Sequence, residues 1–207
     1  MQSKQPVLQA MLSELETRKD YLKGETIESI YFGGGTPSLL SVDELHQFLD
    51  ACARYFHLSP NAEYTLEANP DDLDLEKVKQ LRVAGFNRLS IGMQSFYDED
   101  LLYMNRSHTA AHAEQCIQLA RDGGFTNFSI DLIFGYPLLS DSKWAHTVQQ
   151  VIALGVPHLS CYAMTVEPRT ALASFIRSKK VPPIDAAQSA AQFEYLMQEL
   201  RNAGYLH

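Results

Sequence analysis

The sequence alternates between short apolar segments and longer segments whose apolar residues recur at helical spacing. Five segments combine β-branched and aromatic residues with flanking glycine, proline or asparagine, as buried strands do. They are residues 27–32, 62–70, 88–96, 127–137 and 158–168. Strands that alternate with helices pair in parallel through right-handed crossovers, so the sequence predicts an α/β fold with a parallel sheet. The alternation alone leaves open whether the sheet is an open Rossmann-like sheet or a curved or closed barrel.

Helices are predicted before, between and after these strands. Ser41 and Glu44 have the spacing of a capping box, and glycines mark the ends of several helices. The predicted helices cover residues 6–22, 41–56 and 74–84, a segment through Ala113 and Ala120, a segment through Trp144 and Val151, and Asp185 to Gly204. Residues 169–184 are predicted to be irregular.

Composition limits the kind of protein this can be. At 207 residues the chain is long enough for one hydrophobic core, so we expect residues 1–207 to form a single domain. The formal charge of −8 comes without a basic cluster, which argues against nucleic acid as a partner. No apolar run approaches the roughly 20 residues of a membrane span, and the N-terminus lacks the pattern of a signal peptide. We therefore expect a cytoplasmic protein.

The three cysteines, Cys52, Cys116 and Cys161, are too widely spaced for a CxxC metal site or a disulfide framework. We expect them to be reduced, buried and without a metal.

Three consecutive glycines follow the first predicted strand, in the sequence YFGGGTP. Glycine either permits a positive φ or removes a Cβ so that a ligand can approach the main chain, and Pro37 restricts the exit of the loop. A simple tight turn would use glycine as well. The loop matches neither GxxxxGK[ST] nor GxGxxG, so it carries neither the phosphate-binding nor the dinucleotide-binding fingerprint.

Polar residues stand at or near the carboxyl end of every predicted strand. Ligands of parallel α/β folds bind at this edge, so we expect these groups to converge on one site. They are Gly33–Thr36, Glu67, Asn69, Gln94, Ser95, Asp131 and Tyr162–Thr165. Glu67 and Asp131, on an otherwise apolar sheet face, suit the hydroxyl groups of a ribose or a divalent metal. Arg106 follows the third strand and is suited to pair with a substrate carboxylate.

Six segments together resemble one known family. YFGGGTPS, TLEANPDD, RLSIGMQSF, MNRSHT, IDLIFGYP and LSCYAMTVEP occur in the order and spacing of oxygen-independent coproporphyrinogen III oxidase-like radical SAM proteins, and look most like their heme chaperone branch. The resemblance covers nearly the whole chain. It implies a partial (β/α)6 barrel with S-adenosylmethionine (SAM) across the strand ends, of which this chain holds five βα units and lacks the first strand.

The resemblance also implies roles for individual residues. The loop of Gly33, Gly34, Gly35 and Thr36 would hold the methionyl amino and carboxylate groups of SAM, and Glu67 would face the cofactor. Four further residues match positions that meet a second SAM in the oxidase branch: Gln94, Arg106, Asp131 and Ala163. No residue of this chain is assigned a catalytic or a metal-binding role.

The sequence departs from the family pattern in two places. Family members carry a CxxxCxxC motif before GGGTP, whose thiolates hold a [4Fe-4S] cluster, and the heme chaperone branch has an HNxxYW segment and a C-terminal domain. Neither feature occurs here, so the chain resembles an internal part of a longer protein. Without the cluster no electron reaches SAM, and we predict that this chain alone is not a radical enzyme.

The resemblance leaves two functions open. The longer protein is expected to be a heme chaperone, with heme or a porphyrin as its ligand and a heme-accepting protein as a partner, because MNRSHT and the glycine-loop segment look closer to that branch. The alternative is an oxidase that decarboxylates coproporphyrinogen propionates, and a third reading is an unrelated metal-dependent barrel. A missing first strand would leave residues 27–32 as an unpaired edge, which predicts a homodimer.

Overall fold

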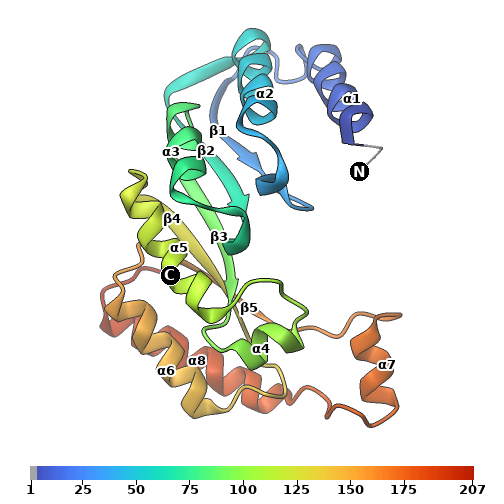
Figure 1. Cartoon of the computed structure of the whole chain (residues 1–207), viewed down its shortest axis with the longest axis vertical. Coiled ribbons are helices and arrows are strands. Elements are labelled where there is room, and N and C mark those ends of the chain that lie inside the picture. Colours follow the sequence, from blue (N-terminus) through green and yellow to red (C-terminus); the bar gives the residue numbers. More distant parts are fainter. Residues whose placement is uncertain (1–3) are drawn as a thin grey trace.

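The computed structural model describes residues 4–207, in which five parallel strands form one curved sheet (Figure 1). The strands are β1 (Thr26–Phe32), β2 (His57–Ala68), β3 (Arg88–Gln94), β4 (Asn127–Phe134) and β5 (His158–Ala163). They pair in the order β1-β2-β3-β4-β5, so each strand lies beside the one that precedes it in the chain. A Rossmann sheet reverses its strand order part-way. The sequential order found here excludes the Rossmann alternative and agrees with the barrel alternative. The sheet forms a half-barrel.

The helices lie mainly on the convex side of this sheet, as Figure 1 shows for α3, α5 and α6. The helices that separate consecutive strands are α2 (Val42–Tyr55), α3 (Leu75–Val83), α4 (Asp98–Tyr103), α5 (Ala110–Asp122) and α6 (Asp141–Ala153). Outside the strands in sequence are α1 (Lys4–Thr17), α7 (Ala171–Arg177) and α8 (Ala186–Asn202), and short 3-10 turns follow β1 and β2 at Pro37–Leu39 and Pro70–Asp72. No helix of residues 4–207 is both long and apolar enough to cross a membrane.

The predicted helix starts are confirmed where a capping side chain marks them. Ser41 accepts from the backbone N–H of Glu44, whose side chain in turn accepts from the N–H of Ser41, which completes the capping box of α2. Ser140 caps α6 and Asp185 caps α8 in the same way, through backbone N–H groups of the first turn.

Two short helices were not predicted. Helix α7 lies within residues 169–184, which were expected to be irregular, and its seven residues include none that is buried. Helix α4 occupies six residues after β3. Both are too short to show a clear apolar period. Helix α1 ends at Thr17 instead of residue 22, and β3, β4 and β5 each end before their predicted limits.

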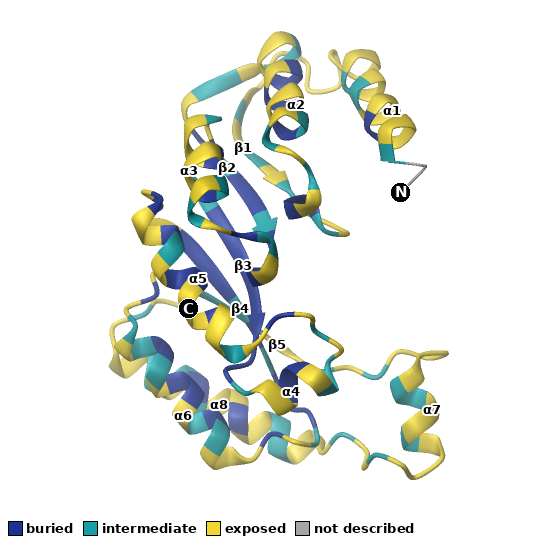
Figure 2. Cartoon of the chain, viewed as in Figure 1, coloured by how far each residue is buried: buried dark blue, intermediate teal, exposed yellow. Residues whose placement is uncertain are grey.

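The two faces of the sheet differ in chemistry. Alternate residues of the strands, such as Leu66, Ile91 and Ile130, are fully buried under the helices and form the main core (Figure 2). The residues between them point into the concave side and are polar, among them Thr65, Glu67, Arg88, Ser90, Ser129 and Asp131. The expectation of an otherwise apolar face around Glu67 and Asp131 was therefore wrong. The concave face carries many polar side chains that are hydrogen-bonded to one another.

Candidate functional site

The glycine loop leaves β1 in a conformation that only glycine adopts easily. Gly34 and Gly35 have φ angles of +80° and +65°. Gly33 serves a different purpose, since a Cβ there would lie 2.8 Å from the ring of Tyr31 and 3.0 Å from the carboxylate of Glu67. The first glycine makes room for side chains on the concave face, and the next two turn the backbone.

Glu67, at the end of β2, binds this loop directly. Its Oε2 atom accepts a hydrogen bond from the backbone N–H of Gly34 at 3.0 Å, and its Oε1 atom accepts from the hydroxyl group of Tyr31 at 3.0 Å. The carboxylate thus fixes the loop of the neighbouring strand. Each oxygen keeps a second lone pair for a ligand.

Ser38 anchors the other side of the loop. Its hydroxyl group donates to Asp72 at 2.6 Å and accepts from the backbone N–H of Asn69 at 3.3 Å, while Lys77 donates to its carbonyl oxygen. Ser38 is fully buried. These bonds join the segment after β1 to the segment after β2, so the two strand ends form one connected rim.

Gln94 ends β3 in a strained conformation. Its φ is +60°, a region that residues other than glycine rarely occupy, and the register of β3 on β4 shifts at this point. The side chain is buried, and its Oε1 atom has no hydrogen-bond partner among the described residues. A Cβ at Gly92 would lie 2.7 Å from the Gln94 amide nitrogen, so this glycine leaves space for the glutamine. An unpaired acceptor in this position is ready to bind a donor from a ligand.

Asp131, on β4, ends a chain of hydrogen bonds across the concave face. The guanidinium group of Arg88 donates to Ser129 at 3.0 Å, Ser129 donates to Ser90 at 3.0 Å, and Ser90 donates to Asp131 at 3.3 Å. Burial raises the pKa of Asp131, and hydrogen bonds from Ser160 and Ser90 only partly oppose this shift.

Arg106 is half-buried in the loop after α4. Burial lowers the pKa of its guanidinium group, while the negative charges of Asp71 and Asp131 oppose that shift. Arg106 forms no ion pair with any residue of 4–207. The group is always charged, so it is available to a ligand carboxylate.

These residues meet around one cavity of about 190 Å³ at the carboxyl rim of the sheet. Of the residues that the sequence proposed for cofactor binding, the cavity is lined by Gly35, Thr36, Glu67, Gln94, Arg106 and Asp131. Gly33 and Gly34 lie on the adjoining side of the loop, where they line an apolar cavity next to β1. Ala163 is exposed at the end of β5 and is not among the lining residues of either cavity.

Four lining residues were missed by the sequence analysis: Ser38, Ala68, Ser90 and Gly92. The signal for two of them was present. Ser90 and Gly92 precede Gln94 at intervals of two residues, and alternate residues of a strand share a face. The role of Ser38 depends on a contact with Asp72, far away in sequence, which no local pattern shows.

The described residues do not fit an iron–sulfur cluster. No group of three His, Cys, Asp or Glu side chains within 4–207 is arranged to hold a metal ion. Burial raises the pKa of Cys116 and Cys161 to about 12, so both thiols stay protonated and are poor ligands. Cys52 and Cys116 are buried as expected, whereas Cys161 is only partly buried.

The fold and the site define a class of protein. A half-barrel of sequential parallel strands, a triple-glycine loop and convergent polar side chains at the carboxyl rim form a ligand-binding domain of the β/α-barrel type. A model of the Radical SAM superfamily matches residues 9–151 of the sequence. The chain therefore belongs to the radical SAM superfamily.

The chain is similar to proteins named Heme chaperone HemW. It is 37% identical to the protein of that name from Haemophilus influenzae over 96% of this chain and 51% of the relative, and 37% identical to that from Escherichia coli K12 with the same coverage. Its structure is similar to that of coproporphyrinogen III oxidase (HemN) from Escherichia coli, with a TM-score of 0.84 and 27% identity over 100% of this chain and 48% of the other. The chain spans about half the length of the curated relatives that it matches.

Proposed function

We propose that the rim cavity binds SAM. The observation that carries this proposal is that one cavity joins the glycine loop, the carboxylates of Glu67 and Asp131, the unpaired Oε1 atom of Gln94 and the guanidinium group of Arg106. SAM presents an ammonium group and ribose hydroxyl groups to such acceptors, and a carboxylate to such donors. The cavity is smaller than the roughly 300–1,000 Å³ of ordinary ligand pockets, so it takes part of the ligand and the rest lies along the open strand ends.

In this arrangement each residue has a role in binding. The exposed backbone of Gly34 and Gly35 approaches the methionyl group closely, and Glu67 keeps that loop in place. Arg106 pairs with the ligand carboxylate, and Asp131 accepts from a hydroxyl group. Bound SAM is the source of a 5'-deoxyadenosyl radical in proteins that also hold a reducing cluster. The residues of this chain bind and orient the ligand.

Calorimetric titration of the 207-residue chain with SAM tests this proposal. We expect saturable binding, which Arg106→Gln weakens by about tenfold or more, because a hydrogen bond to a charged group contributes about 1.5–3 kcal/mol. Arg201→Gln is the matched control, since Arg201 is exposed on α8. Absence of binding to the unmodified chain, or equal affinities for the two variants, would contradict the proposal.

For the whole protein that contains this half-barrel, we propose a heme chaperone in heme or porphyrin metabolism. Support comes from the relatives named Heme chaperone HemW, at 37% identity, against 27% for the coproporphyrinogen III oxidase structure. The oxidase remains the second candidate, because its fold matches over the full chain. Titration of the full-length protein with heme separates the two. Binding of heme by a chaperone shifts the absorption band of the heme. An oxidase consumes coproporphyrinogen and leaves the heme spectrum unchanged.

A further inference from the structure

The backbone around Gln94 forms a tight turn that few residues tolerate. The N–H group of Ser95 donates to the carbonyl oxygen of Met93 at 2.8 Å, which closes a three-residue γ-turn with Gln94 at its centre. With a positive φ at the central residue, this type of γ-turn is rare and strained. A strained backbone persists only where the surrounding structure holds it in place. The contacts of the two residues that flank Gln94 therefore decide how its side chain is presented.

A buried carboxylate holds the residue after Gln94. Asp100, on α4, is completely buried, and its Oδ2 atom accepts from the hydroxyl group of Ser95 at 2.9 Å. The same hydroxyl group accepts from the backbone N–H of Tyr97 at 3.1 Å, so the Ser95 side chain is fixed on both sides. Asp100 does not line the cavity. It is connected to the cavity through Ser95 and the turn at Gln94.

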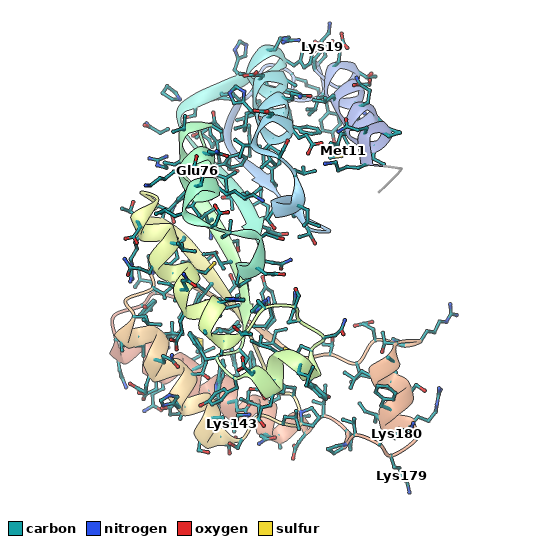
Figure 3. All side chains as sticks on the ribbon, viewed as in Figure 1. Met11, Lys19, Glu76, Lys143, Lys179 and Lys180 are labelled. Atoms are coloured by element: carbon teal, nitrogen blue, oxygen red, sulfur yellow. The ribbon has the colours of Figure 1, made fainter. Side chains whose placement is uncertain are left out.

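Asp100 also binds the two segments that follow β4. Its Oδ2 atom accepts from the hydroxyl group of Tyr136 at 2.6 Å, and its Oδ1 atom accepts from the ammonium group of Lys143 at 2.9 Å. Lys143 lies at the start of α6, where Figure 3 labels it. A buried carboxylate with three donors from three segments is well satisfied. It joins the end of β3 to the segments beyond β4.

We propose that Asp100 is a positioning residue, which holds Gln94 in its strained turn through Ser95 and so presents the Gln94 side chain to the rim cavity. This inference rests on the proposed binding of SAM at that cavity. A second clamp acts on the other side of the turn. The buried Nε2–H of His108 donates to the carbonyl oxygen of Met93 at 3.1 Å. Both residues that flank Gln94 are thus held by buried side chains.

Two substitutions that each remove one hydroxyl donor to the Asp100 Oδ2 atom distinguish the positioning of Gln94 from a general effect on stability. Ser95→Ala removes the donor that leads to Gln94, and Tyr136→Phe removes the other hydroxyl donor, which does not. We expect both variants to unfold at lower temperature. Only Ser95→Ala should weaken SAM binding, by about tenfold, while Tyr136→Phe should stay within about twofold of the unmodified chain. Equal affinities for the two variants would overturn the proposal.

A measurement without ligand keeps this inference separate from the proposed function. Hydrogen exchange at the backbone amide of residue 95, followed by NMR, reports the γ-turn bond to Met93 directly. Asp100→Asn and Ser95→Ala should speed this exchange by about tenfold, and Tyr136→Phe should leave it unchanged. If the unmodified chain binds no SAM, the proposed function fails, and the exchange rates still decide whether Asp100 holds the turn. Unchanged exchange in Asp100→Asn would refute the positioning role.

Discussion

The carboxylate of Glu67 and the backbone N–H of Gly34 are joined by a hydrogen bond of 3.0 Å. An acidic side chain from the second strand therefore fixes the loop that follows the first strand. The bond is made possible by Gly33, because any Cβ at that position would come within 3.0 Å of the same carboxylate. Loop geometry and carboxylate position are coupled at this point of the rim.

Gly33→Ala should impair SAM binding without much loss of stability. The added methyl group pushes the side chains of Tyr31 and Glu67 away, and neither side chain is part of the buried core. We expect affinity to fall by about tenfold or more and the free energy of unfolding to change by less than about 1 kcal/mol. Gly24→Ala is the control, since Gly24 has a φ of +81° with no atom near its Cβ position. That variant should lose about 1 kcal/mol of stability through backbone strain and bind normally. Calorimetry and urea unfolding measure the two effects.

Asp131→Asn should stabilise the protein at neutral pH. Burial raises the pKa of Asp131 in the folded state above the usual value of 3.8, which the unfolded state keeps. At a pH between the unfolded-state pKa and the folded-state pKa, the folded state therefore binds more protons than the unfolded state. Stability therefore falls as the pH rises through this window. Asparagine keeps the acceptor for Ser90 and carries no charge, so we expect a gain of about 1 kcal/mol at pH 7 together with weaker SAM binding. Lower stability of Asp131→Asn at neutral pH would show that the ionised form is the favoured one.

His108→Gln should reduce the acid sensitivity of the fold. Burial lowers the pKa of His108, so the unfolded state takes up a proton first as the pH falls. The unfolded state then binds more protons, and stability is lost as the pH drops below about 6.5. Glutamine keeps a donor for the carbonyl oxygen of Met93 and does not titrate. Urea unfolding between pH 7 and about pH 5 should show a flatter dependence for His108→Gln, while His112→Gln, at an exposed position on α5, should resemble the unmodified chain.

Anaerobic incubation of the 207-residue chain with iron and sulfide should build no [4Fe-4S] cluster. Three thiolates close together are required, whereas Cys52, Cys116 and Cys161 lie on α2, α5 and β5 and burial raises the pKa of each thiol. Iron content and the visible absorption spectrum should match those of a variant with all three cysteines replaced by alanine. A cluster spectrum that disappears in the variant, or formation of 5'-deoxyadenosine above background, would contradict this prediction.

The outer edge of β1 should promote self-association. Within residues 4–207, β1 pairs with β2 alone, and an apolar cavity of about 550 Å³ separates it from α1. Met11, labelled on α1 in Figure 3, lines that cavity and is half exposed. Sedimentation velocity should show a concentration-dependent dimer, which Met11→Glu weakens by placing a charge beside the edge. Val83→Glu, at an exposed position on α3, should leave the dimer intact, and a monomer at all concentrations would exclude it.

The sequence predicted the parts of the fold that local patterns determine. Long helices with an apolar stripe and a capping residue, such as α2 and α8, were located closely because their signals extend over several turns. The early part of β2 was missed, since Ser59-Pro60-Asn61 has the composition of a turn. It pairs with the start of β1 across a register shift, where the missing N–H of proline is tolerated.

The candidate site was predicted in outline because parallel strands end at a common edge. Six of the nine proposed binding residues line the same cavity. Three features were beyond the sequence. The left-handed turn at Gln94 depends on Asp100 and His108, the anchoring of the loop depends on Ser38 and Asp72, and the position of Ala163 depends on how far β5 extends. None of the three is shown by the periodicity or the local motifs of the sequence.

The strictly sequential strand order has a consequence for biosynthesis. Within residues 4–207, each strand after β1 pairs with the strand made just before it, so no βα unit of this part has to wait for a segment that leaves the ribosome much later. Once Val83 has left the ribosome, β1, α2, β2 and α3 are all available and can begin to pack. Each later βα unit adds to the edge of the sheet soon after it is made, so each edge strand is exposed only briefly. The chain segments that connect pairing strands are short, which keeps the entropy cost of closing them small. The same order lets translation and assembly of the half-barrel proceed in step.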